Sequence, residues 1–338
     1  EYDKIIKLKD ENKPDELFRK LFIKQCNKLH EILPELFEKL DDYSELLLTI
    51  SFTDKDGIVY RLVHGIEEDD FNIEKEGQVE IIGWLYQYYN IEPKVKVFAK
   101  PKGEKISKEE IPAATQLFTP DWIVRYMVEN SLGRLWQERN MAQNDNDIGH
   151  WEDNNYLRCH WKYYIEEAEQ EENVQRQLEK IRKEYKNITP ESIKVIDPCM
   201  GSGHTLVYAF DVLMQIYESC GYTQREASRN ILNNNIYGFD IDKRAYQLTY
   251  FAIMMKARQY NRRILTEGIK PNVYFIENSK ELSKSALDRM GEYKDKVQKL
   301  ITEFKNADEY GSIINTSLSE NDLQNISNQI DFINNHKD

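Results

Sequence analysis

A glycine-rich loop follows a run of β-branched residues near the middle of the 338-residue chain. The run Ile193–Ile196 is typical of a buried strand, and it leads into Asp197–Gly203, which reads D-P-C-M-G-S-G. Glycine lets backbone N–H groups approach a ligand closely, and the helix expected from His204 onward would point its N-terminus at the same place. The strand, loop and helix together predict a cradle for a nucleotide-like ligand.

A second acidic residue ends the next predicted strand. Ile236–Phe239 is expected to form this strand, and Asp240 follows it directly. Ligands of open α/β sheets bind beyond the carboxyl ends of the strands, so we expect Asp197 and Asp240 to face one pocket. A carboxylate beside the glycine loop can hold an ammonium group, and one after the next strand can hold the hydroxyls of a ribose.

Other nucleotide-binding motifs fit this loop poorly. A phosphate-binding P-loop requires Gly-Lys-Ser/Thr, which is absent from the sequence. The dinucleotide fingerprint G-x-G-x-x-G would need a glycine where the chain has Leu206. Its acid lies about 20 residues further on, whereas Asp240 lies 37 residues after Gly203. S-adenosylmethionine (SAM) has an amino-acid end, a sulfonium and an adenosine but no pyrophosphate, and we expect it to be the cofactor.

Helical regions are expected before and after a parallel sheet that is wound with helices. Short apolar strands alternate with helices within residues 111–280, which predicts an α/β unit. Residues 1–110 carry apolar side chains at three- and four-residue spacing, typical of a mainly helical domain, in which Ile81–Tyr89 is expected to be a buried helix. A polar insertion at about 140–188 and the stretch 281–338 are also expected to be helical. The acidic run at 166–172 is interpreted as the solvated face of a helix.

These motifs resemble those of one enzyme family. The loop D-P-C-M-G-S-G is similar to the D-P-x-x-G-S-G motif of N6-adenine DNA methyltransferases. Gln116–Pro120 resembles their upstream F-T-P element, which closes over the SAM carboxylate, and Tyr237–Asp242 resembles their acidic motif. Longer stretches, at 111–139 and within 246–260, resemble the PglX-type methyltransferases of bacterial phage-exclusion (BREX) systems. The resemblance covers about residues 80–280, and those proteins are much longer than this chain.

The resemblance implies a fold and a set of site residues. The fold is α/β, with an incomplete SAM-dependent methyltransferase Rossmann-like parallel sheet preceded and followed by helical regions. Asp240 would bond the ribose, Ile241 would pack on the adenine ring, and Asn278 would bond the adenine amino group. The cofactor-binding residues predicted in this way are Phe118, Thr119, Pro120, Asp197, Pro198, Gly201, Gly203, Asp240, Ile241 and Asn278.

The catalytic loop of N6-adenine methyltransferases is absent from the sequence. That family uses an N-P-P-Y/F/W loop, which binds the target amino group and stacks on the flipped base. None of the nine prolines here is adjacent to another. We therefore assign no catalytic residue and expect the chain to be the N-terminal, cofactor-binding fragment of a larger methyltransferase. We expect this fragment alone not to methylate DNA.

Charge and composition bear on the partners. The net charge is −13, whereas proteins that bind DNA phosphates are expected to be basic. We expect double-stranded DNA to be bound by parts of the parent protein outside this chain, with other phage-defence proteins as further partners. The four cysteines and six histidines form no metal-binding pattern. No segment reaches the roughly 18 apolar residues of a membrane span, and we expect a cytoplasmic protein.

Two alternatives remain open from the residues alone. A non-catalytic SAM-sensing or protein-interaction module would use its helical N-terminal part to bind a partner, which the aromatic segment near Trp84 and the acidic surface allow. A SAM methyltransferase acting on RNA or protein would carry the same cofactor motifs. An N-P-P-Y loop elsewhere in the gene would favour the DNA enzyme over both.

Overall fold

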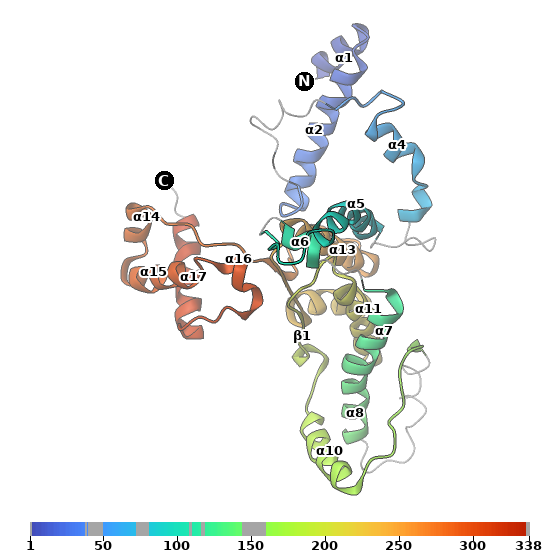
Figure 1. Cartoon of the computed structure of the whole chain (residues 1–338), viewed down its shortest axis with the longest axis vertical. Helices are drawn as coiled ribbons and strands as arrows, with labels where there is room; N and C mark the ends of the chain where they lie inside the picture. Colours follow the sequence, from blue (N-terminus) through green and yellow to red (C-terminus); the bar gives the residue numbers. More distant parts are fainter. Residues whose placement is uncertain are drawn as a thin grey trace.

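The computed structural model describes residues 2–37, 39, 50–71, 81–107, 110–115, 119–143 and 160–335. A small sheet region lies at the centre, and helical arms extend from it (Figure 1). The α-helices are α1 (Tyr2–Asp10), α2 (Pro14–Ile32), α4 (Ile58–Gly65), α5 (Ile81–Phe98), α6 (Ile111–Thr115), α7 (Asp121–Val128), α8 (Arg134–Gln143), α10 (Glu172–Tyr185), α11 (His204–Ser219), α12 (Gln224–Asn230), α13 (Lys243–Tyr260), α14 (Lys284–Arg289), α15 (Lys294–Glu303), α16 (Ala307–Tyr310) and α17 (Glu320–Asn335). No helix in these ranges is both long and apolar enough to cross a membrane.

The sheet has three parallel strands in the described residues. They are β1 (Val195–Asp197), β2 (Ile236–Asp240) and β3 (Asn272–Phe275), and they lie side by side in this order. Parallel neighbours need crossover connections. Helices α11 and α12 form the first crossover, and α13 forms the second. The predicted α/β fold, with an incomplete Rossmann-like parallel sheet between helical regions, is confirmed.

Helix α11 is the centre of the hydrophobic core. Nine of its sixteen side chains are buried, and burying a large aliphatic or aromatic side chain contributes about 1.5–3 kcal/mol. It packs against α13, β1 and β2 on one face of the sheet, as expected when successive crossovers run in the same direction and follow the general right-handed preference. On the opposite face, Ile196 and Tyr274 remain 59% and 50% exposed. Within the described residues, only one face of the sheet is covered by helices.

A buried asparagine holds the chain segment that enters β1. Asn235 ends a π-helical turn at Ile231–Asn235 and is fully buried. Its Nδ2 donates to the carbonyl oxygens of Pro190 and Ile193 at 2.7 and 2.8 Å, and its Oδ1 accepts from the Tyr217 hydroxyl at 3.0 Å. Because a buried amide must have its hydrogen bonds satisfied, this residue fixes how β1 and α11 meet.

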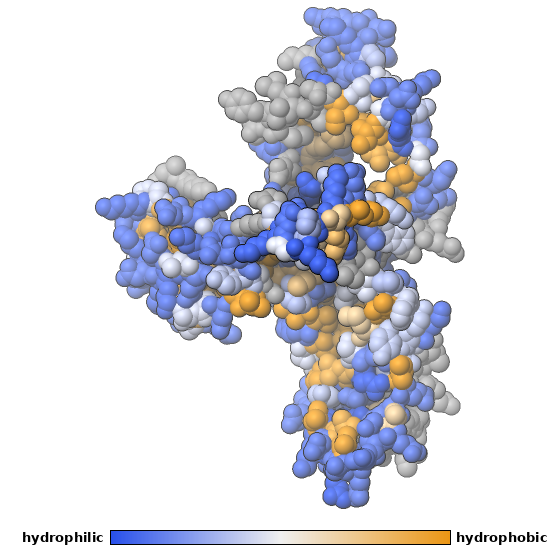
Figure 2. Space-filling model, in the orientation of Figure 1, coloured by the Kyte–Doolittle hydropathy of each residue, from blue (hydrophilic) through white to orange (hydrophobic). Residues whose placement is uncertain are grey.

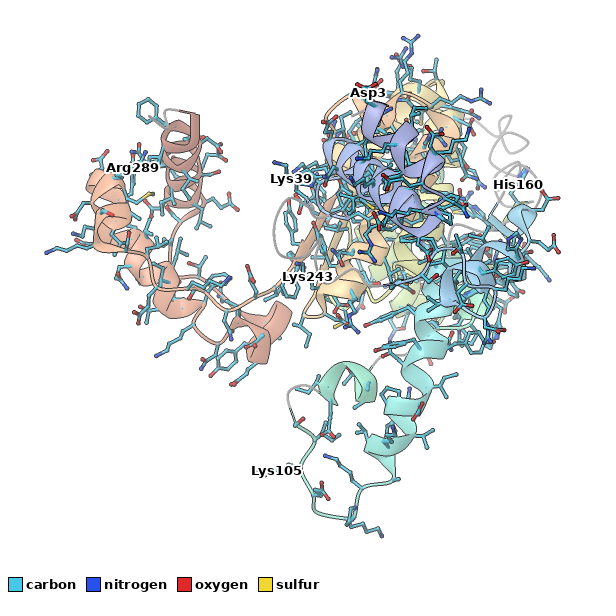
Figure 3. The ribbon with its side chains drawn as sticks, turned by 90° about the horizontal axis from the view of Figure 1, so that it is seen from above. Asp3, Lys39, Lys105, His160, Lys243 and Arg289 are labelled. Carbon is cyan, nitrogen blue, oxygen red and sulfur yellow. The ribbon has the colours of Figure 1, made fainter. Side chains whose placement is uncertain are left out.

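The C-terminal helices form a unit of their own. Met290, Val297 and Ile326 are buried together, and Leu300 and Ile301 pack against them. Seen from above, the helix that ends at Arg289 and its neighbouring C-terminal helices stand to one side of the main body (Figure 3). The helical character predicted for the end of the chain is confirmed.

The predicted burial of the aromatic segment Ile81–Tyr89 is wrong. The segment lies within α5, but Trp84 is 41% exposed and Tyr88 is 71% exposed. Apolar surface gathers over the N-terminal helices on the face shown in Figure 2. Hydrophobic composition predicts that a helix tends to be buried, but in the described residues no segment covers Trp84 and Tyr88 of α5.

The acidic run is a loop and not a helical face. Helix α10 begins only at Glu172, and residues 161–171 form no helix. Successive glutamates repel each other across helical turns. Arg182 on α10 instead pairs with Glu167 from this loop and with Glu138 on α8. The solvent exposure predicted for the run is confirmed, and its helical structure is corrected.

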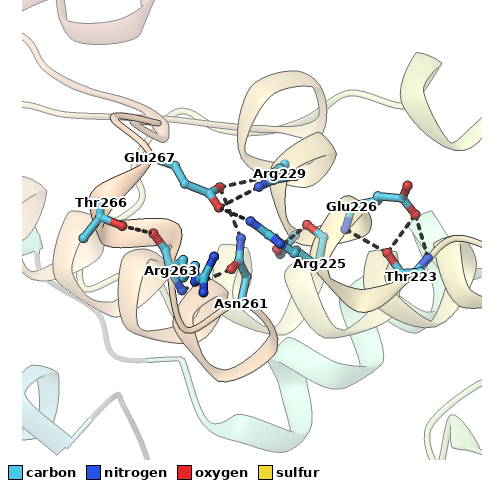
Figure 4. A network of polar contacts seen from close by, with 9 residues as sticks. Thr223, Arg225, Glu226, Arg229, Asn261, Arg263, Thr266 and Glu267 are labelled. Carbon is cyan, nitrogen blue, oxygen red and sulfur yellow. Dashed lines mark hydrogen bonds and ion pairs between the residues drawn. The ribbon is translucent and has the colours of Figure 1, made fainter.

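A carboxylate network joins α12 to the turn that follows α13 (Figure 4). The Glu267 carboxylate accepts from Arg229 Nε and Nη2 at 2.7 and 2.6 Å, from Arg225 Nη2 at 3.2 Å, and from Asn261 Nδ2 at 3.3 Å. The hydrogen bond from Arg229 is the main cause that lowers the pKa of Glu267 to about 2. The network therefore stabilises the fold only while this carboxylate is ionised.

Replacing Glu267 by Gln is expected to lower the free energy of unfolding at pH 7 by about 1 kcal/mol, because the ion pair with two partly exposed arginines is lost. The pKa of Glu267 is lower in the folded than in the unfolded chain. Its contribution is therefore present above about pH 4.5 and is lost as the pH falls towards 2. Urea denaturation at pH 7 and pH 3.5 checks this, with exposed Glu184→Gln as control. An equal difference at both pH values would contradict it.

Candidate functional site

The loop between β1 and α11 requires glycine at two positions. Gly201 and Gly203 have φ angles of +55° and +86°, a region that side chains disfavour. A Cβ added to Gly203 would lie 2.8 Å from Thr249 Oγ1. That hydroxyl donates to the Gly201 carbonyl oxygen at 2.8 Å. Helix α13 thus holds the loop from behind, and no side chain fits between them at Gly203.

The Asp240 carboxylate joins the loop to β2. It accepts from the Gly201 N–H at 2.9 Å and from the Asp242 N–H at 2.8 Å, one to each oxygen. Met200 N also donates to the Phe239 carbonyl oxygen at 3.0 Å. A carboxylate offers about four acceptor positions. Asp240 is therefore fixed in orientation and retains acceptor capacity for a ligand.

Burial changes the pKa values of both strand-terminal acids. Desolvation raises the pKa of Asp240, and the hydrogen bonds from Asp242 and Gly201 oppose this. Desolvation also raises the pKa of Asp197, whose Oδ1 accepts from Cys199 N at 3.1 Å. Keeping these carboxylates ionised costs free energy, which a cationic or hydroxyl-bearing ligand at the site would offset.

A pocket of about 510 Å³ lies at this edge of the sheet. Among the described residues, the charged ones that line it are acidic, and they are Asp240, Asp242, Asp308 and Glu309. Next to the loop, burial lowers the pKa of His204, which favours its neutral form. The α11 N-terminus adds the positive end of a helix dipole at Gly203, which has no side-chain cap. The pocket thus has an acidic wall, and the N-terminus of α11 beside it favours an anionic group.

Five of the predicted cofactor-binding residues line this pocket, namely Thr119, Pro198, Gly201, Asp240 and Ile241. Four others, Pro120, Asp197, Gly203 and Asn278, are described but do not line it. Phe118 lies outside the described residues. Contact of the ten residues with a cofactor remains a prediction.

Helix α5 contributes to the pocket, which the sequence analysis did not predict. The Tyr86 hydroxyl donates to Asp242 Oδ2 at 2.6 Å, although the two residues are 156 positions apart. A Cβ added to Gly83 would lie 2.9 Å from the Cβ of Ser202, so the helix backbone lies directly against the glycine loop. Glycine lets two backbones approach closely. Gly83 within this aromatic helix is therefore the sequence feature that could have indicated the contact.

Two further segments outside the sheet complete the pocket. Ile111 and Thr115 come from α6, and residues 308–311 come from α16 and the turn after it. Neither segment carries a ligand-binding motif that spacing alone reveals. Their place at the site follows only from the fold.

Curated proteins similar to this chain include two adenine-specific methyltransferases, while no protein-family model matches it. The adenine-specific methyltransferase PglX of Lacticaseibacillus casei (strain Zhang) is 47% identical over 281 residues, which are 82% of this chain and 22% of that protein. The adenine-specific methyltransferase BrxX of Escherichia coli O9:H4 (strain HS) is 46% identical over 269 residues, which are 80% of this chain and 20% of that protein. The chain thus spans about a fifth of the length of these relatives.

Replacing Gly203 by Ala is expected to lower the free energy of unfolding by about 2–3 kcal/mol, from left-handed strain and the clash with Thr249. Gly221→Ala is the matched control. Gly221 has the same φ of +86°, but an added Cβ would meet nothing within 4 Å. Urea denaturation of both variants separates strain from clash. Equal losses in the two would show that packing against Thr249 does not constrain the loop.

Proposed function

Because this chain belongs with the PglX-type adenine-specific methyltransferases, we propose that it is the SAM-binding portion of an adenine-specific (N6) DNA methyltransferase. We place the parent protein in bacterial phage defence or restriction-modification. The acidic pocket at the carboxyl ends of β1 and β2 carries the proposal. SAM supplies a methyl group on a sulfonium, and its target would be the N6 amino group of adenine.

The chemistry of the pocket fits this cofactor. Its volume of about 510 Å³ falls within the range of about 300–1,000 Å³ usual for small-molecule sites. An acidic lining favours a ligand with an ammonium and a sulfonium and disfavours one with a pyrophosphate. Asp240 would bind the ribose hydroxyls, Ile241 would contact the adenine, and the N-terminus of α11 would face the carboxylate.

We propose that the remaining steps of the reaction belong to other parts of the parent protein. The sequence has no N-P-P-Y loop to hold a flipped adenine, and the net charge of −13 does not favour DNA binding. Double-stranded DNA would be bound outside this chain, in a cytoplasmic protein that acts with other phage-defence proteins. Within the chain we propose a helical domain at 1–110, a SAM-binding part at 111–280 and a helical part at 281–338.

The purified chain is expected to bind one SAM molecule, and Asp240→Ala is expected to weaken binding at least tenfold. The reason is that charge-assisted hydrogen bonds to the ribose are lost. Isothermal titration calorimetry measures both affinities. Asp331→Ala, at an exposed aspartate of α17, is the control, and Asp240→Asn tests the charge while keeping the side-chain shape. Absence of SAM binding by the unsubstituted 338-residue chain at millimolar SAM would overturn the proposal.

The chain alone is expected not to transfer a methyl group to DNA, because it lacks the loop that holds the target base. Incubation with radiolabelled SAM and adenine-rich duplex DNA, followed by counting of the purified DNA, checks this. The full-length parent protein is the positive control. Incorporation above background by the 338-residue chain would show that its own residues complete the active site.

A further inference from the structure

The C-terminal helices return to the cofactor pocket at one turn. Helix α16 ends at Tyr310, and a 3₁₀ turn follows at Gly311–Ile313. The rest of this unit packs around its own core of Met290, Val297 and Ile326. Residues 308–311, however, line the same pocket as Asp240 and Ile241, and the 3₁₀ turn packs against β2. A unit that stands apart from the sheet in Figure 3 therefore supplies part of the pocket wall.

Residues that follow β3 hold this turn in place. The Asp308 N–H donates to Asn278 Oδ1 at 3.1 Å. The neighbouring Ser279 N–H donates to the Phe304 carbonyl oxygen at 2.9 Å, and the Ser279 hydroxyl donates to the Ile301 carbonyl oxygen. Hydrogen bonds to the end of α15 and to the first turn of α16 thereby fix this segment relative to β3. Asn278 has a structural function here that is separate from any contact with a cofactor.

The turn approaches Ile241 closely. Gly311 adopts φ +57° and ψ −138°, a conformation suited to glycine, and an added Cβ would lie 3.7 Å from Ile241 Cγ2. The preceding residue, Tyr310, is 55% exposed and lines the pocket. The pocket thus presents an aliphatic side chain after β2 and a half-exposed aromatic ring on the adjacent turn. Both side chains offer apolar surface to a flat group bound in this pocket.

We propose that Tyr310 stacks on the purine ring of SAM, so that the C-terminal helical unit provides the purine-binding wall of the cofactor site. The inference rests on the proposed function, since it assumes that the pocket binds SAM. Stacking on an aromatic side chain suits a purine because both have flat π faces, and removing such a ring typically weakens binding about tenfold or more. Tyr310 is then a cofactor-binding residue that the glycine-loop motifs do not reveal.

Titration calorimetry of the 338-residue chain tests the proposal, with SAM and adenosine as probes. Tyr310→Ala is expected to weaken binding of both probes about tenfold, because adenosine retains the purine and lacks the amino-acid end. Tyr310→Phe keeps the ring, and its affinity for both probes is expected to lie within twofold of that of the unsubstituted chain. Ile313→Ala is the matched control, since Ile313 lies in the 3₁₀ turn directly after Tyr310 and is 79% exposed.

The outcomes separate this inference from the proposed function. If the unsubstituted 338-residue chain binds no SAM, the proposed function and the role of Tyr310 are both overturned. If it binds SAM, Asp240→Ala weakens binding and Tyr310→Ala does not, the SAM site stands and the role of Tyr310 is refuted. A Tyr310→Phe variant as weak as Tyr310→Ala would refute ring stacking. Weaker binding by Tyr310→Ala, but not by Tyr310→Phe or Ile313→Ala, with unchanged thermal unfolding of Tyr310→Ala, supports the proposal.

Discussion

The hydrogen bonds of the Asp240 carboxylate connect the parts from which the pocket is built. One oxygen accepts from the glycine loop and the other from the start of α13, so a single side chain sets the distance between β2, the loop and the helix. Burial raises the pKa of this acid, which shows that its ionised form is held at a cost. The protein tolerates the cost because the backbone donors oppose it. A positively charged or hydroxyl-rich ligand would oppose it further.

Two segments distant in sequence line the pocket beside this acid. Helix α5 lies against the glycine loop at Gly83 and bonds Asp242 through Tyr86, while the turn at 308–311 approaches Ile241 from the C-terminal unit. The helical parts before and after the sheet are therefore structural components of the pocket. A shift of the helical part before the sheet, or of the part after it, would alter the shape of the pocket without any substitution in the motif residues. Such a shift is a physical route for coupling between the site and its surroundings.

The sheet itself is covered unevenly. Helices α11 and α13 bury one face, while Ile196 and Tyr274 on the other face stay half-exposed in the described residues. Such a one-sided parallel sheet is unusual, since parallel sheets are normally covered by helices on both faces. The chain spans about a fifth of the length of its methyltransferase relatives.

The sequence by itself determined the local elements and the motif residues. Short apolar runs predicted β1 and β2, and the glycine loop and Asp240 followed from local patterns. Strand propensity and glycine conformation depend on near neighbours in the sequence. The tertiary structure alone decided which residues enclose the pocket. Tyr86 and Tyr310 carry no local signal, since their positions at the pocket depend on packing between segments that are distant in the sequence. Burial of α5 was also mispredicted for this reason, because an apolar helix indicates a preference for contact and not the partner that provides it.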